Sequence, residues 1–164
     1  MPGWSVAHVL THLARNAEAM CRRIDAAVRG EILEQYAGGR EGRENEIDWG
    51  ATRPPSDINS DLRHWCDSLD STFESIDAPV WDRTVRTVGG AEHPVRLLPF
   101  RRWREVEVHM VDLDGEFRPQ DWSQALVAAA LPRLIDGLVG RANDRELMAW
   151  LLGRGAAPPL DPWG

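Results

Sequence analysis

Apolar residues near the start of the sequence recur at steps of three and four positions, which places them on one face of an amphipathic helix. Ser5 is a residue type favoured just before a helix, and Gly30 interrupts the pattern. The pattern therefore predicts a helix from about Ser5 to Val28. Its apolar stripe consists of Val6, Val9, Leu10, Leu13, Ala17, Met20, Ile24 and Val28.

Two further segments show the same helical period. One follows the Pro-Pro-Ser of residues 54–56 and stops at the Asp-Ala-Pro of residues 77–79. The other runs from about Pro99 to Leu113, with Gly115 as its end. Their apolar positions are Ile58, Leu62, Trp65, Leu69, Phe73 and Ile76 in the first, and Trp103, Val106, Met110 and Leu113 in the second.

Residues 84–88 and 94–96 lie on either side of a Gly-Gly pair and predict a small hairpin. Residues 30–55 show no such pattern, since they are polar and rich in Gly, Arg and Glu. They predict a long, partly ordered connection with at most a short helical turn at residues 41–48.

A fourth helical pattern spans residues 122–139 and is interrupted by Pro132, and a short fifth pattern covers residues 145–152. The tail, residues 153–164, holds three of the 11 prolines and predicts an extended chain. Together the patterns predict a mainly α protein, an up-and-down helical bundle.

The composition excludes several classes of protein. It is 43% hydrophobic and 27% charged, which indicates a globular domain. The formal net charge of −7 argues against a nucleic-acid partner. No stretch approaches the roughly 20 apolar residues that cross a bilayer, and no signal segment is present, so we expect a cytoplasmic protein without a membrane partner. Cys21 and Cys66 have no metal-binding or redox spacing and are expected to be reduced.

Two predicted helices carry candidate metal ligands at a spacing of four residues, which puts both members of a pair on one helix face. These are His8 and His12 in the first helix, and Glu105 and His109 in the third. On a helical wheel His12, Glu105 and His109 lie about 80° to 120° from the centres of their apolar stripes. Such boundary positions meet in the groove between packed helices, where a cofactor site is reachable.

The remaining histidines are weaker candidates. His8 lies about 160° from the centre of its stripe and is expected to be exposed. His64 and His93 are expected at the surface as well. A Glu and a His at this spacing more often form a solvated surface pair, so spacing alone leaves both interpretations of Glu105 and His109 open.

If the three boundary residues converge, the chemistry is that of a catalytic metal site. Two imidazoles and one carboxylate suit Zn²⁺ and leave one coordination position for water or substrate. Asp112, three residues after His109, and Asn16, one turn after His12, could orient a ligand or a bound water. Ni²⁺ and Mn²⁺ could use the same ligands.

Three segments of the chain resemble one protein family in order and spacing. Residues 3–17 read GWSVAHVLTHLARNA, residues 44–50 read ENEIDWG and residues 104–113 read REVEVHMVDL. They resemble the mycothiol-dependent maleylpyruvate isomerase family, whose N-terminal metal-binding domain belongs to the DinB-like superfamily. The resemblance covers about residues 3–115.

The resemblance implies a DinB-like bundle over residues 1–116, lacking the family's first helix, and a shortened C-terminal region over residues 117–164. His12, Glu105 and His109 would be the zinc ligands, and the zinc would bind mycothiol, the low-molecular-weight thiol of actinobacteria. The thiolate would add to maleylpyruvate, and rotation and elimination would give fumarylpyruvate.

The same resemblance suggests how the dianionic substrate is bound. Arg43 matches an arginine of the family's loop, and Arg154 lies in a Gly-Arg-Gly that resembles a C-terminal family motif. Either could bind a carboxylate with two hydrogen bonds. A bundle without its first helix would expose apolar surface and favour a partner chain, such as a second copy in a homodimer.

Two alternatives to the isomerase stay open. One is a mycothiol S-transferase that detoxifies electrophiles with the same site, and it differs in consuming the thiol. The other is a catalytically silent metal-binding module, which binds metal without binding the thiol.

The wheel assignment predicts that His12→Ala abolishes metal binding, because one of three ligands is lost, whereas His8→Ala leaves it nearly intact. Metal content per chain, measured by elemental mass spectrometry on protein purified without chelator, checks this. Equal loss in both variants would contradict the assignment.

Overall fold

The computed structural model describes residues 3–113 and 115–161. The chain forms two compact units, one ending at Asp121 and the other beginning at Trp122. The division into separate domains at residue 116 stays a prediction. None of the helices in the described ranges is long and apolar enough to cross a membrane.

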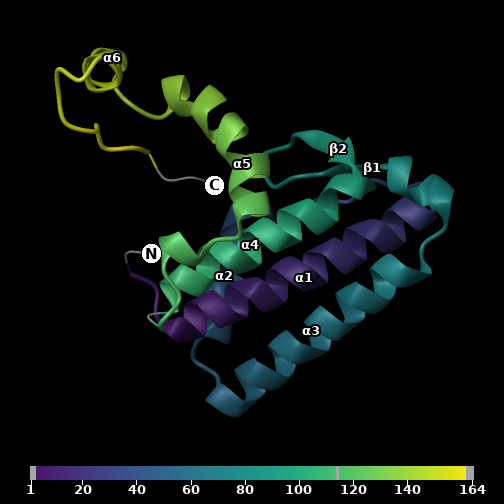
Figure 1. The fold of residues 1–164 in the computed structure, drawn as a ribbon. Coiled ribbons are helices and arrows are strands. Elements are labelled where there is room, and N and C mark those ends of the chain that lie inside the picture. The colour runs from purple at the N-terminus through teal and green to yellow at the C-terminus, as the bar shows by residue number, and fades with distance from the viewer. Residues whose placement is uncertain (1–2, 114, 162–164) are drawn as a thin grey trace. The chain divides into compact units, whose positions relative to one another are not determined.

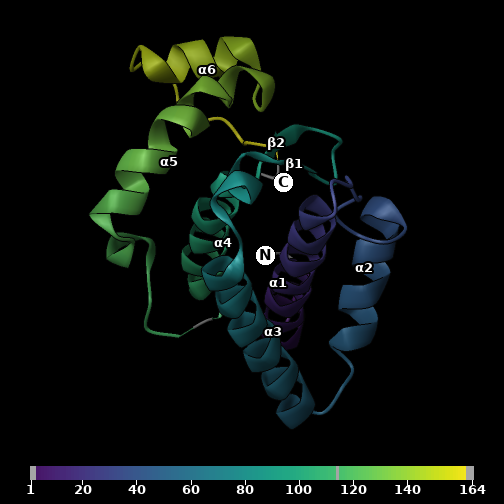
Figure 2. The ribbon, with the colours of Figure 1, turned by 90° about the vertical axis from the view of Figure 1, so that its right-hand side faces the viewer.

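A central helix, α1 (Val6–Val28), organises the first unit. It lies between α3 (Pro55–Ser75) and α4 (Leu98–Asp112), and α2 (Gly39–Gly50) packs beside it (Figures 1 and 2). Helix α4 begins just after a hairpin that contacts the end of α1, so it runs back toward the start of α1. The predicted mainly helical bundle is confirmed.

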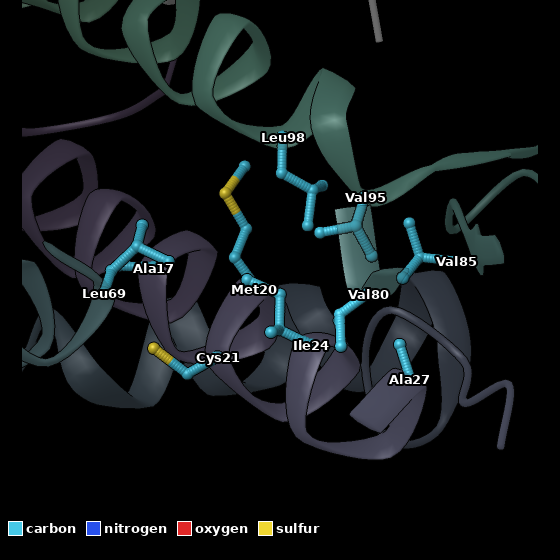
Figure 3. Close-up of a cluster of buried hydrophobic side chains, with 10 residues drawn as sticks. All are labelled: Ala17, Met20, Cys21, Ile24, Ala27, Leu69, Val80, Val85, Val95 and Leu98. Carbon is cyan, nitrogen blue, oxygen red and sulfur yellow. The ribbon is translucent and has the colours of Figure 1, made fainter. Parts of the chain in front are cut away.

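The hydrophobic core forms along α1, where α3, α4 and the hairpin meet it (Figure 3). Helix α1 is enclosed on several sides, so more than half of its residues are buried, including polar ones outside the apolar stripe. Cys21 is buried, Cys66 is half-buried, and both are free thiols. The core cluster consists of Ala17, Met20, Cys21, Ile24, Ala27, Leu69, Val80, Val85, Val95 and Leu98.

The predicted hairpin is present and short. Strand β1 (Thr84–Arg86) pairs antiparallel with β2 (Glu92–Pro94), and single turns of 3-10 helix flank it at Ala78–Asp82 and Val95–Leu97. The expectation that His93 lies at the surface is wrong, because the residue is only 8% exposed. His93 pairs with Val85 across the hairpin, on the face that packs against the core.

The partly ordered connection expected over residues 30–55 holds more helix than the short turn predicted at residues 41–48, since the 12-residue helix α2 lies there. Only Ile47 and Gly50 of that helix are buried, so it shows no apolar stripe. A Cβ atom at Gly50 would lie 2.4 Å from Cγ2 of Thr11 on α1. The missing side chain of Gly50 is therefore what lets α2 approach α1.

The second unit consists of α5 (Gln124–Asp136), a 3-10 turn (Leu138–Gly140) and α6 (Asp144–Leu151). Helix α5 contains Pro132 and ends earlier than the predicted residue 139. The described part of the tail, up to Asp161, has no helix or strand, and residues 162–164 of the predicted tail lie outside the described residues.

Replacing Gly50 by Ala should lower the free energy of unfolding by about 1–3 kcal/mol, because the methyl group overlaps Thr11. In an open helix the same change would stabilise by about 0.5–1 kcal/mol. Urea unfolding shows whether the substitution lowers or raises the free energy of unfolding. Gly115→Ala is the control, because a Cβ atom at Gly115 meets nothing within 4 Å. Unchanged or higher stability of Gly50→Ala would contradict the tight contact.

Candidate metal centre

The packing of α4 against α1 brings His12, Glu105 and His109 together. Nε2 of His12 lies 3.2 Å from Oε2 of Glu105, and Nε2 of His109 lies 3.7 Å from the same oxygen. The ligand atoms of all three residues lie within 4.8 Å of one another. A tetrahedral zinc ion with bonds of about 2.0–2.1 Å spaces its ligands by roughly 3.3 Å, so the donor set and its spacing fit such an ion.

The site is more deeply buried than its wheel positions predict. His12 is 3% exposed and His109 is 5% exposed, so neither is the boundary residue that we expected. A helical wheel places a residue only relative to the apolar stripe of its own helix. It does not include the other elements that pack around α1 and bury residues outside that stripe. Trp4 also covers the site, with its ring centroid 5.4 Å from that of His12 and 6.4 Å from that of His109.

Asp112 contacts the ring of His109, and its predicted role in orienting a metal ligand stays a prediction. Nδ1 of His109 lies 2.8 Å from Oδ2 of Asp112, which can only accept a hydrogen bond when ionised. Nδ1 of His109 therefore donates to Asp112, and Nε2 lies on the side of Glu105. Such a carboxylate–histidine pair commonly fixes the tautomer of a metal-binding histidine.

Arg43 also lies at the site, through its contact with His12. Its Nη2 atom is 3.2 Å from Nδ1 of His12, which must accept because a guanidinium only donates. The His12 ring proton is then on Nε2 and is donated to Glu105. The guanidinium of Arg43 lies over the rings of Trp4 and Tyr36, at 5.7 and 5.8 Å from their centroids. Its predicted role in substrate binding stays a prediction.

The other candidates have different contacts. Oδ1 of Asn16 accepts a bond from Arg102 at 3.0 Å, rather than bonding a member of the triad. His8 is half-buried instead of exposed; its Nδ1 accepts from the backbone N–H of Ser5 at 3.2 Å and lies 2.7 Å from the Ser5 hydroxyl. Arg154 belongs to the second unit, where its side chain is exposed and bonds nearby carbonyl groups; its role stays a prediction.

Burial and mutual contacts set the protonation of the site. Burial alone raises the pKa of Glu105, but the hydrogen bond from His12 and the positive charges around the carboxylate lower it below its usual value. Burial lowers the pKa of His12, and the charge of Arg43 acts in the same direction against the bond to Glu105. A carboxylate and a neutral imidazole are therefore present at neutral pH, which are the forms that bind metal.

Sequence reasoning missed two residues of this region. Trp4 precedes the helix and belongs to no periodic pattern, although it stands in the segment that resembles the family. Tyr36, which is 4% exposed, lies in the segment expected to be irregular.

Comparison with known proteins assigns the chain to a family. Residues 1–114 match the family model of the mycothiol maleylpyruvate isomerase N-terminal domain. The chain belongs to this family. A comparison with curated proteins gives no match.

Two solved structures are similar to the chain. A crystal structure of the mycothiol-dependent maleylpyruvate isomerase is 29% identical with a TM-score of 0.75, and the match covers 78% of this chain and 53% of that protein. A histidine-to-alanine mutant of the isomerase is 28% identical with a TM-score of 0.74 and the same coverage. The chain thus matches about half the length of these structures.

Removing the carboxylate that orients His109 should weaken metal binding without removing a ligand. Asp112→Ala is expected to lower zinc affinity by about 10- to 100-fold, because the His109 ring loses its fixed tautomer and orientation. Competition with a chromophoric chelator measures this affinity. Asp70→Ala, which changes an exposed aspartate of α3, serves as the control. An affinity loss of the same size in both variants would contradict the role of Asp112.

Proposed function

We propose that this chain holds a divalent metal ion, zinc by its donor set, at His12, Glu105 and His109, and that it acts with mycothiol in a maleylpyruvate isomerase-like reaction. The observation that carries the proposal is the convergence of two imidazole nitrogens and one carboxylate oxygen from α1 and α4. Membership of the family, and the solved isomerase that shares the fold, support the choice of thiol and reaction.

The residues around the triad would prepare the site for this chemistry. A bound dication lowers the pKa of a coordinated thiol and keeps it as a thiolate at neutral pH. Asp112 would hold the His109 ring with Nε2 directed toward Glu105. Trp4 packs against both imidazoles and keeps water away from one side of the site, which strengthens the local electrostatic interactions.

Cationic side chains would bind an anionic substrate. Arg43 already lies at the triad, where its guanidinium can reach a ligand that approaches His12. Arg154, on the second unit, is the other candidate from the sequence, and its guanidinium is exposed. Each could bind a carboxylate of maleylpyruvate with two hydrogen bonds.

The proposal predicts that turnover of maleylpyruvate to fumarylpyruvate requires both zinc and mycothiol and leaves the thiol unconsumed. Glu105→Gln should lose metal and at least about 100-fold in rate, since a neutral amide replaces the anionic ligand. Glu74→Gln, an exposed position on α3, is the matched control. Absorbance follows the product, and thiol titration before and after the reaction follows mycothiol.

Each alternative gives a different result in this assay. If the assay converts mycothiol stoichiometrically into a conjugate, the activity is that of an S-transferase rather than an isomerase. Bound zinc without measurable affinity for mycothiol would indicate a silent metal-binding module. Zinc binding that is equal in wild type and Glu105→Gln would contradict the proposed ligand set.

A further inference from the structure

A small basic pocket borders the candidate metal centre. Its volume is about 250 Å³, counting space open to solvent. Glu105 lines the pocket and is also a member of the triad, so the pocket lies next to the candidate metal centre. Three guanidinium groups and one carboxylate are the charged groups of the lining. The full lining consists of Asn16, Met20, Arg23, Gln35, Arg101, Arg104 and Glu105.

Arg23 is the most unusual member of this lining, because its charge is buried without an acidic partner among the described residues. The residue is 2% exposed. Its Nε donates to the carbonyl of Ala19 at 3.1 Å, and its Nη1 donates to the carbonyl of Arg86 at 3.0 Å. Within the described part of the chain Nη2 has no hydrogen bond. A buried cation of this kind is stabilised when an anion joins it.

Three cations and one anion line the pocket, and Nη2 of Arg104 lies 3.8 Å from Oε1 of Glu105. Burial lowers the pKa of Arg23 to about 10, and the charges of Arg101 and Arg22 act in the same direction against the opposing effect of Tyr36. Burial also lowers the pKa of His93, and Arg101 and Arg23 contribute to that shift. Burial is the largest cause of both shifts, and the charge of Arg101 adds to each.

The two amide side chains of the lining also present donors. The carbonyl oxygen of Gln35 already accepts from the backbone N–H of Val88 at 2.8 Å, and that of Asn16 accepts from Arg102 at 3.0 Å. The NH₂ groups of Gln35 and Asn16 have no hydrogen-bond partner among the described residues. Donors on amides and guanidiniums favour an oxyanion over a neutral or cationic ligand.

We propose that this pocket is a carboxylate-binding subsite that holds one acid group of an organic acid. A planar carboxylate matches the fork of a guanidinium, and its single negative charge suits a pocket that also contains the Glu105 carboxylate. A phosphate dianion would meet stronger repulsion from Glu105. Glu105 belongs to both the pocket and the metal triad. Resting on the proposed function, an acid bound in this subsite would therefore extend toward the triad.

Calorimetric titration of the metal-free full chain with maleate, a small dicarboxylate, tests the subsite without metal or thiol. Arg101→Gln and Arg104→Gln should each weaken maleate binding by about tenfold or more, because each removes a charge-assisted hydrogen bond. Arg40→Gln, an exposed arginine of α2 outside the pocket, should bind like wild type. These positions on α4 avoid replacing Arg23, whose bonds connect α1 to the hairpin.

Several outcomes would overturn the subsite: no maleate binding by wild type, equal binding by all variants, or tighter binding of inorganic phosphate than of maleate. Zinc titration of the same proteins separates this inference from the proposed function. Arginine-dependent maleate binding by a chain that does not bind zinc would support the subsite while refuting the metal centre. Zinc binding without maleate binding would refute the subsite alone.

Discussion

The pairing of α4 with α1 is the constraint on which both the fold and the site depend. Arg102 on α4 donates to the backbone carbonyl of Leu13 at 2.8 Å and to the side chain of Asn16 at 3.0 Å, and its Nη2 lies 3.3 Å from Sγ of Cys66 on α3. One guanidinium thus connects three helices. Arg102 bonds the carbonyl of Leu13, the residue after His12. This bond fixes the position of α4 along α1 at which His12 faces Glu105 and His109.

This pairing requires α1 to bury polar groups, which other elements must satisfy. Glu105 bonds His12, Arg102 bonds Asn16 and the hairpin carbonyl at Arg86 bonds Arg23. The residues that could bind metal and anion are therefore also part of the interior. Substitutions of these side chains are therefore expected to change stability together with any binding.

The sequence predicted those parts of the molecule that rest on periodicity or on a recognisable motif. The stripes of α1, α3 and α4 predicted these helices to within a few residues, and two short motifs pointed to the triad. Helix α2 was predicted only as a short turn because its buried residues are only Ile47 and Gly50. The burial of His93 was missed because it comes from long-range contacts, and no local pattern distinguishes Arg23 from the other arginines of the chain.

The hydrogen bond between Arg43 and His12 would have to change if the triad held the proposed metal ion. A metal ion on Nε2 of neutral His12 would require the ring hydrogen to be on Nδ1, where it would face a guanidinium that offers only donors. Two donors would repel each other, so Arg43 would have to turn away from His12. Its contacts with Trp4 and Tyr36 do not depend on the His12 tautomer and would hold the guanidinium near the site. With a metal bound, Arg43 would therefore be available to an anionic ligand instead of being paired with His12.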